Sequence, residues 1–278
     1  MKLKIGTAKL QEMVSRSIKG AGNNKLIPLT SLMNVSLKKD KLTLVTTDAT
    51  NYLYVSEKDV KGDDFSITVP IETFSKLIAR MTCENIELEL KDTCLQVKGN
   101  GKYSIELPLD ENGELIAYPD PLSEVKLKKA DEVNFTTIAT ILTSVRPSLS
   151  VTLEEPCYTG YYVQDKVIAT DLCKMAWLDE TVLKEPKLIS ADMMNLLSVM
   201  TAEKINVCIK DNVIVFYTDN VTVYGLAMEG IDDFEIDALT GLIDTKFESH
   251  CKLATGELLQ YLTVCLCSLE LMTKMLCC

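Results

Sequence analysis

An internal repeat limits the possible folds of this chain more than any other feature of its sequence. The segment Val69–Gly99 reappears without a gap as Leu188–Thr218, and Met81 corresponds to Met200 at an offset of 119 residues (200 − 81 = 119). In both copies, apolar residues first recur at i, i+3, i+4 and i+7, as on one face of a helix, and then alternate with polar residues, as in a half-buried strand. Each copy is therefore predicted to fold as helix, strand, turn and strand.

The residues upstream of each copy also follow a common pattern. The first repeat begins with a predicted strand, Lys2–Ile5, and a helix, Thr7–Lys19, in which Thr7 is the expected N-cap. The second begins with a predicted strand near Val133 and a helix near Thr137–Arg146, which Pro147 ends. The repeat therefore covers most of two domains.

Two complete domains and the beginning of a third are predicted. The copies correspond to domains 1–121 and 127–240, separated by a proline-containing linker. A third beginning is visible where Cys251–Leu258 aligns with Leu3–Leu10 at an offset of 248 (251 − 3 = 248). Residues 247–278 are therefore predicted to be the stub of a third domain.

The end of that stub departs from the pattern of the repeat. Residues 263–278 lose the helical periodicity, and they hold four of the ten cysteines of the chain. We hypothesise that these sixteen residues are an out-of-frame reading of the third domain. Resequencing the gene across this region tests the hypothesis.

Composition is that of an ordinary soluble globular protein, with 47% hydrophobic and 25% charged residues. No basic, apolar, cleavable leader is present, so we expect a cytoplasmic protein without a membrane segment. The cysteines outside the tail are scattered singly, which favours reduced and mostly buried thiols over disulfides.

Charge is distributed unevenly along the chain. The net charge of −11 argues against a nucleic-acid binder, because phosphate contacts come from lysine and arginine. Residues 1–39, however, contain eight basic residues and one acidic residue, Glu12. A basic first helix allows an acidic protein to hold DNA on one surface, although a merely solvated helix face is an equally good interpretation.

The chain contains no recognisable catalytic, cofactor or metal site. The single histidine, His250, is adjacent to Cys251, and neighbouring side chains project apart, which disfavours a catalytic dyad. A threonine–aspartate pair follows a predicted strand in both repeats, ending at Asp48 and at Asp171, with an offset of 123 (171 − 48 = 123). These carboxylates could form a paired site, but side-chain capping of two turns is the preferred interpretation.

The order and spacing of these motifs resemble those of the bacterial and phage beta sliding clamps of DNA polymerase III, over residues 1 to about 262. The resemblance rests on the opening strand and helix, on Ile27-Pro28-Leu29 before Thr47-Asp48, on Val167-Ile168 before Thr170-Asp171, and on the repeated unit. It implies an α+β DNA-clamp (processivity) fold, in which repeated domains each pack two helices on antiparallel sheets.

The resemblance implies that the protein forms a ring around DNA and tethers the replicative polymerase. This function is not enzymatic and needs no cofactor. Two three-domain subunits join head to tail in the family, and the helices line the hole. Double-stranded DNA, polymerase peptides and clamp-loader peptides are the implied partners. Such a homo-oligomer is doubtful here because the third domain is incomplete.

The resemblance also implies two sets of site residues. The residues expected to contact DNA lie on the helices and on one loop, and Asn24 takes a place that is usually basic: Lys9, Arg16, Lys19, Asn24, Lys25, Lys76, Arg80 and Arg146. The residues expected to form the pocket for partner peptides are Tyr158, Thr170, Leu172, Cys173, Lys174 and Met175. The family usually has glycine and histidine where this chain has Leu172 and Cys173.

Two other functions stay open. One is a clamp-fold scaffold that binds polymerase peptides without closing a ring on DNA. The other is an enzyme whose site the residue pattern does not reveal. Gel filtration with and without circular DNA separates the first from a clamp.

Overall fold

The computed structural model describes residues 1–22, 24–125, 131–246 and Gly256. The chain divides into two compact units, Met1–Phe234 and Glu235–Cys278, which are taken one at a time below. The predicted stub 247–278, including the proposed frameshifted segment 263–278, lies outside the described residues except for Gly256. Both therefore stay predictions, as does the division into domains 1–121 and 127–240.

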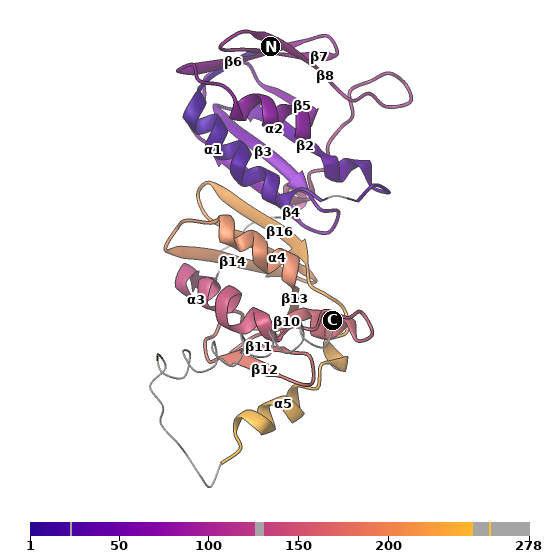
Figure 1. Cartoon of the computed structure of the whole chain (residues 1–278), viewed down its shortest axis with the longest axis vertical. Helices are drawn as coiled ribbons and strands as arrows, with labels where there is room; N and C mark the ends of the chain where they lie inside the picture. Colours follow the sequence, from indigo (N-terminus) through magenta and orange to yellow (C-terminus); the bar gives the residue numbers. More distant parts are fainter. Residues whose placement is uncertain (23, 126–130, 247–255, 257–278) are drawn as a thin grey trace, which may run out of the picture. The chain divides into compact units, whose positions relative to one another are not determined.

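The first repeat folds as strand, helix, four strands, helix and three strands (Figure 1). Its elements are β1 (Lys2–Gly6), α1 (Thr7–Ser17), β2 (Leu32–Lys38), β3 (Lys41–Thr47), β4 (Tyr52–Glu57), β5 (Phe65–Pro70), α2 (Ile71–Ala79), β6 (Asn85–Lys91), β7 (Cys94–Lys98) and β8 (Lys102–Glu106).

The second repeat has the same order of elements, which confirms the duplication expected from the sequence. Its elements are β9 (Asp131–Asn134), α3 (Phe135–Thr140), β10 (Gly160–Val163), β11 (Val167–Thr170), β12 (Met175–Leu178), β13 (Lys187–Ser190), α4 (Ala191–Leu196), β14 (Lys204–Lys210), β15 (Val213–Tyr217) and β16 (Val221–Leu226). A π-helical turn, Ile141–Val145, and a 3-10 turn, Arg146–Ser148, continue α3.

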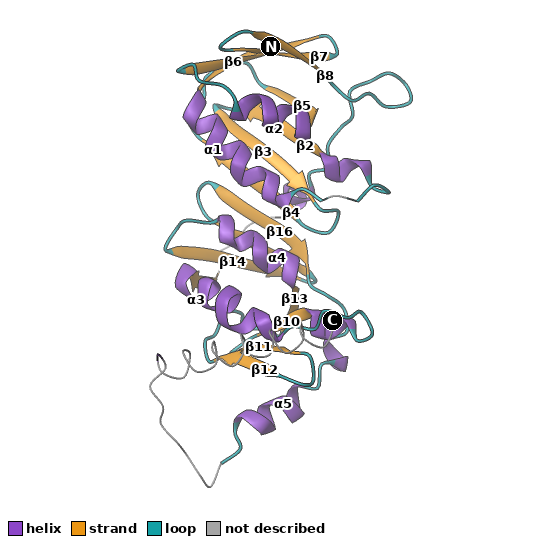
Figure 2. Cartoon of the chain, viewed as in Figure 1, coloured by secondary structure: helices purple, strands orange, loops and turns teal. Residues whose placement is uncertain are grey.

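Three antiparallel sheets make up the first unit, and one of them is shared by both repeats (Figure 2). The shared eight-stranded sheet has the order β5-β2-β3-β4-β16-β15-β14-β9. Four-stranded sheets β1-β6-β7-β8 and β12-β11-β10-β13 complete the two repeats. At the junction of the shared sheet, Tyr54 of β4 pairs with Thr222 of β16, and Tyr52 pairs with Tyr224. The α+β architecture predicted from the sequence, with helices packed on antiparallel sheets, is confirmed.

The helices cover the apolar face of the sheets. Leu10, Met13 and Val14 of α1 are buried, and so are Phe74 and Ile78 of α2, as their helical spacing predicts. The two helices lie side by side, and the Gln11 amide donates hydrogen bonds of 2.9 Å to the carbonyls of Ile78 and Met81. Ile78 lies in the last turn of α2 and Met81 lies just after its end, so these bonds hold the end of α2 against α1.

Two local expectations were wrong. Thr7 is not the N-cap of α1: that position is Gly6, and the buried Thr7 hydroxyl instead lies 3.6 Å from the Cys83 sulfur. The cysteines of the described residues are free, as expected, but only Cys157 is fully buried, whereas Cys173 is exposed. The other three cysteines, Cys83, Cys94 and Cys208, are half-buried.

The second unit contains one described helix, α5 (Ile236–Ile243). Within the ranges that the structure describes, no helix is both long and apolar enough to cross a membrane.

Candidate nucleic-acid interface

The basic residues of α1 lie beside acidic side chains. Lys9 is exposed, and its ammonium group lies 2.6 Å from a Glu57 carboxylate oxygen on β4. The hydrogen bond that the ammonium group donates to Glu57 and the charge of that carboxylate raise the pKa of Lys9. Arg16 lies 2.6 Å from Glu12, one turn earlier on the same helix. Lys19, just past the helix, is exposed and has no carboxylate within 4.0 Å among the described residues.

The second helix shows the same contrast between a paired and an unpaired cation. Lys76 lies 2.5 Å from Glu72, four residues earlier. The hydrogen bond from Lys76 and its positive charge lower the pKa of Glu72. Arg80 follows the last turn of α2 and is exposed. No ion pair of Arg80 is present in the described part of the chain. Since the Gln11 amide holds the end of α2 against α1, Arg80 is placed on a fixed element.

The loop after α1 contributes one free cation. Lys25 is exposed, and the described residues offer it no carboxylate partner. The Asn24 side chain accepts a hydrogen bond of 3.0 Å from the Leu26 amide, so it shapes the turn. Leu26 is 90% exposed at the tip of this turn. The loop therefore presents one positive charge and one apolar side chain to solvent.

The corresponding helices of the second repeat carry little charge. The exposed residues Thr136, Thr140 and Thr143 line α3 and its continuation, and the Thr140 hydroxyl bonds the Thr136 carbonyl at 2.9 Å. Arg146 is exposed at the end of this stretch. Val199, which corresponds to Arg80, is buried. The helices of the second repeat thus offer hydroxyl groups and one arginine.

Lys204, a further cation of the second repeat, lies 2.8 Å from Glu132. The sequence reading missed such acidic partners on both helices of the first repeat. Two of these ion pairs could have been predicted, because Glu12–Arg16 and Glu72–Lys76 have the i, i+4 spacing that brings side chains together on a helix. The pair of Lys9 with Glu57 could not, because Glu57 lies on a strand that is distant in the sequence.

The residues expected to form a peptide pocket separate into buried and exposed groups. Thr170 is buried, and its hydroxyl accepts a hydrogen bond from the Leu172 amide and donates one to the Lys174 carbonyl. Cys173 and Lys174 are exposed, and Met175 is half-buried. Leu172 has a left-handed backbone (φ 67°) and is 56% exposed. Thr170 therefore builds a turn that carries Leu172 outward.

Tyr158 lies in a separate aromatic cluster. It is buried, and its ring centre lies 5.1 Å from that of Phe234, which also stacks on Tyr162 at 5.4 Å. Phe234 itself is 2% exposed. Tyr158 is therefore covered by the chain's own Phe234, whereas the turn after β11 is open to solvent.

The two threonine–aspartate turns are copies of each other. The Asp48 carboxylate accepts hydrogen bonds from the amides of Thr50 and Asn51, and Asp171 accepts them from Cys173 and Lys174. These backbone bonds lower the pKa of Asp171. The capping interpretation of both aspartates is confirmed, and their role is structural.

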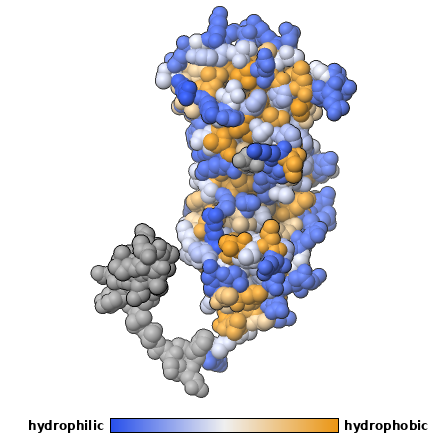
Figure 3. Space-filling model, turned by 45° about the vertical axis from the view of Figure 1, so that its right-hand side comes forward, coloured by the Kyte–Doolittle hydropathy of each residue, from blue (hydrophilic) through white to orange (hydrophobic). Residues whose placement is uncertain are grey.

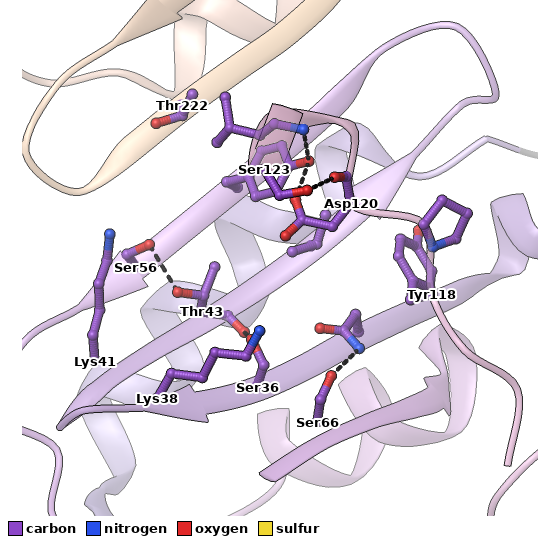
Figure 4. Close-up of a pocket in the computed structure, with 15 residues that line it drawn as sticks. Ser36, Lys38, Lys41, Thr43, Ser56, Ser66, Tyr118, Asp120, Ser123 and Thr222 are labelled. Carbon is purple, nitrogen blue, oxygen red and sulfur yellow. Dashed lines mark hydrogen bonds between the residues drawn. The ribbon is translucent and has the colours of Figure 1, made fainter. Parts of the chain in front are cut away.

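A polar cavity of about 310 Å³ opens on the face of β2, β3 and β4 that the helices leave uncovered (Figure 4). Its upper wall is the segment that connects the repeats. There the Tyr54 hydroxyl donates to Asp120 at 3.1 Å, and Tyr118 donates to the Leu32 carbonyl at 3.2 Å. Burial, then the charge of Asp120, raises the pKa of Tyr54. These hydrogen bonds fasten the connecting segment to the sheet.

Surface hydropathy is mixed. Figure 3 shows hydrophobic patches between hydrophilic ones on the visible face. Large exposed apolar side chains include Leu26, Leu172 and Trp177. Within the described ranges, no group of three or more histidine, cysteine or acidic side chains is arranged to hold a metal ion.

Comparison of the sequence with protein-family models and with curated proteins finds no match. The fold, in contrast, matches many solved structures. A DNA polymerase sliding clamp from Bacillus subtilis superposes with a TM-score of 0.72 at 17% identity, over 83% of this chain and 65% of that one. The DNA polymerase III beta chain of Streptococcus pneumoniae TIGR4 gives 0.70 at 14% identity, over 82% and 65%.

A putative DNA polymerase III beta subunit from Eubacterium rectale ATCC 33656 gives a TM-score of 0.73 at 15% identity, over 89% of this chain and 69% of that one. The chain therefore spans about two thirds of the length of these clamps. At such identities the likeness establishes the sliding-clamp fold.

Proposed function

We propose that this chain, which has the fold of DNA polymerase III beta sliding clamps, is a clamp subunit that surrounds DNA and tethers the replicative polymerase in the cytoplasm. The observation that best supports this is the shared sheet, in which β4 of one repeat pairs with β16 of the next. Such a junction joins unlike edges, so it can repeat around a ring. The regions 1–121 and 127–240 are the proposed clamp domains.

DNA contact is proposed to be electrostatic and independent of sequence. Of the residues expected to contact DNA, Lys19, Lys25, Arg80 and Arg146 have no ion pair in the described residues, and three of them belong to the first repeat. Each phosphate that is neutralised contributes a slope of roughly 0.9 to the dependence of log affinity on log salt. A protein that slides needs only such contacts, and it needs no catalytic group.

Retention on nicked circular DNA tests the proposal. Changing Lys19, Lys76 and Arg80 to glutamate should abolish retention at low salt while leaving the circular dichroism spectrum unchanged. The matched control changes Lys58, Lys61 and Lys91, which are exposed on turns and strands, and should be retained like the wild type. Undiminished retention of the helix variant would refute these contacts.

The same assay separates a ring from a scaffold. A ring stays on circular DNA and slides off linear DNA, whereas a scaffold that only binds polymerase peptides stays on neither. A clamp is therefore expected to be retained on circular DNA and to be released from linear DNA.

A partner peptide is proposed to bind at the turn that carries Leu172. The left-handed backbone of Leu172 is unfavourable for a residue with a branched side chain. Because this apolar side chain is exposed, burial does not offset that cost. Such a costly residue is explained if it contacts a partner. Polymerase and clamp-loader peptides with an apolar end fit this surface, with Met175, Cys173 and Lys174 beside it.

Leu172→Gly tests the peptide site because it separates stability from binding. Glycine tolerates the left-handed backbone, so the variant should gain about 1 kcal/mol in unfolding free energy and lose most peptide affinity. Ala49→Gly, at the same position of the first repeat (φ 90°), is the control: it should gain stability and keep peptide binding. Unchanged binding by Leu172→Gly would place the peptide elsewhere.

A further inference from the structure

A row of four hydroxyl side chains forms the floor of the polar cavity on the face that the helices leave uncovered. The row crosses β5, β2, β3 and β4. The strand register places Ser66 opposite Ser36, Ser36 opposite Thr43, and Thr43 opposite Ser56. Because these side chains are small, they leave a space of about 310 Å³ above them, which is at the small end of the range for ligand pockets.

Two lysines lie beside this hydroxyl row. Lys38 and Lys41 pair with each other across the β2–β3 hairpin, so their β-carbons lie about 5 Å apart. Both side chains are exposed, and neither has a carboxylate within 4.0 Å among the described residues. Figure 4 shows them on one side of the row, and Tyr118 and Asp120 on the other. Like charges directly opposite each other destabilise a sheet, and a bound anion would offset this repulsion.

The hydroxyls of the row keep hydrogen-bond donors for a ligand. Thr43 and Ser56 lie 3.2 Å apart and share one hydrogen bond, so one of their two O–H groups is left to donate. The Ser66 hydroxyl accepts a bond of 3.0 Å from the Asn34 amide nitrogen, which leaves its own O–H group to donate. The lysine ammonium groups are donors only. This excess of donors suits the oxygens of a phosphate group.

An acceptor lies on the other side of the row. The Asn34 side-chain nitrogen also donates to the Ile67 carbonyl at 3.1 Å, which identifies the other end of the amide as its oxygen. Asn34 lines the cavity and is only 7% exposed, and in the described part of the chain no group donates to this oxygen. A nearly buried acceptor without a donor costs free energy, and a ligand hydroxyl would remove that cost.

The second repeat lacks this arrangement. At the offset of 123, Thr43 corresponds to Lys166 (166 − 43 = 123), and Ser56 corresponds to Asp179 (179 − 56 = 123). Lys166 and Asp179 form an ion pair with each other. The same two positions therefore hold large side chains that satisfy one another in the second repeat, and small hydroxyls with a spare donor in the first.

We propose that this cavity binds a small phosphorylated polyol, such as a sugar phosphate. The phosphate group lies at Lys38 and Lys41 and accepts from the hydroxyl row, and a hydroxyl of the ligand donates to the Asn34 oxygen. These residues are separate from those proposed to contact DNA or peptides. The proposal can therefore fail without affecting the proposed function, and the reverse also holds.

Isothermal titration calorimetry on the full chain tests the proposal. Ribose 5-phosphate or glucose 6-phosphate should bind at one site, and inorganic phosphate should bind roughly ten-fold more weakly because it cannot donate to Asn34 through a sugar hydroxyl. Absence of binding by both sugar phosphates at millimolar concentration overturns the proposal. Equal binding of inorganic phosphate would contradict recognition of the polyol, and equal binding of unphosphorylated ribose would contradict the role of the lysines.

Removing the lysine pair tests the phosphate end of the site. Lys38→Gln with Lys41→Gln should weaken sugar phosphate binding by roughly ten-fold or more, because charge-assisted hydrogen bonds are lost. Lys58→Gln with Lys61→Gln is the matched control, since it makes the same charge change at exposed lysines that do not line the cavity. An equal loss in both variants would mean that only net charge attracts the ligand, which overturns the site.

Filling the cavity tests the hydroxyl row without changing the net charge. Thr43→Lys with Ser56→Asp copies the Lys166–Asp179 ion pair into the first repeat and should abolish binding. The reverse change, Lys166→Thr with Asp179→Ser, should bind like the wild type. Melting curves establish that each variant is folded, and the lysine variant decides the question if the filled one is not. Undiminished binding by a folded filled variant places the ligand elsewhere and overturns the proposal.

A phosphoserine peptide distinguishes a small ligand from a modified protein. It carries the same phosphate group but lacks the sugar hydroxyls, so it should bind no more tightly than inorganic phosphate. Tighter binding of the peptide than of both sugar phosphates, lost in the lysine variant, would mean that the cavity receives a phosphorylated protein, which overturns the proposal.

Discussion

At the scale of single residues, the neighbours of a cation decide whether it is available to a phosphate. Lys9 and Lys76 lie on the exposed faces of their helices, as periodicity predicts, yet each faces a carboxylate within hydrogen-bonding distance. Lys19 and Arg80 lie on the same two helical segments without such a neighbour. Position on a helix face is therefore an incomplete guide to DNA contact.

Removing an acidic neighbour should strengthen DNA binding. Glu57→Gln frees Lys9 from its ion pair and removes a negative charge, so we expect a several-fold higher affinity for duplex DNA at low salt, which added salt reduces. Fluorescence anisotropy across a salt series measures this. Glu111→Gln makes the same charge change in an exposed loop, and an equal gain there would contradict a specific role of the Lys9 pair.

At the scale of elements, the sequence predicted most helices and strands because the repeat gives two readings of each. The helix faces of Leu10–Val14 and Phe74–Ile78 follow from spacing alone. Helix ends were harder: Gln11 fixes the end of α2 through a contact 67 residues away, which no local pattern reveals. The Glu57 partner of Lys9 and the Phe234 cover on Tyr158 were missed for the same reason.

One carboxylate on β6 forms ion pairs with lysines on β1 and β7, and these ion pairs make the stability of the sheet depend on pH. Glu89 contacts Lys98 at 2.5 Å and Lys2 at 3.1 Å, and these hydrogen bonds lower its pKa to about 2. A lowered pKa in the folded state contributes stability above the unfolded value and loses it as the pH falls.

Glu89→Gln should therefore cost stability above a pH of about 5, and the cost should vanish as the pH approaches about 2. Urea unfolding of both proteins across this range measures the difference. Glu87→Gln, on the same strand but exposed, should not reproduce the trend. A cost that stays constant with pH would contradict the role of these ion pairs.

At the scale of the whole chain, the β4–β16 junction makes the two repeats parts of one sheet. Tyr52 and Tyr224 meet across it edge to face, with ring centres 5.9 Å apart. The connecting segment adds the Tyr54–Asp120 and Tyr118–Leu32 bonds on the outer face. The sequence reveals the repeat but not the junction. Edge strands have similar patterns in a single sequence, so the sequence does not show which of them pair.

A double-mutant cycle on the tyrosine pair measures the junction. Tyr52→Ala and Tyr224→Ala should show a coupling of about 0.5–1.5 kcal/mol in unfolding free energy, the usual range for aromatic pairs. Tyr52→Ala with Tyr103→Ala, which is not part of this contact, should be additive. Additivity of the first pair would mean that the rings contribute nothing to the junction.

The β4–β16 junction forms within one polypeptide, and this sets it apart from any copy of it formed between chains. A covalent connection supplies an effective concentration on the order of millimolar, which the partner strands of separate molecules lack. An interface of equal intrinsic strength between two molecules therefore dissociates on dilution, whereas the junction inside one chain stays formed. In an assembly whose subunits are joined by such interfaces, the protein concentration would set the fraction of interfaces that are formed.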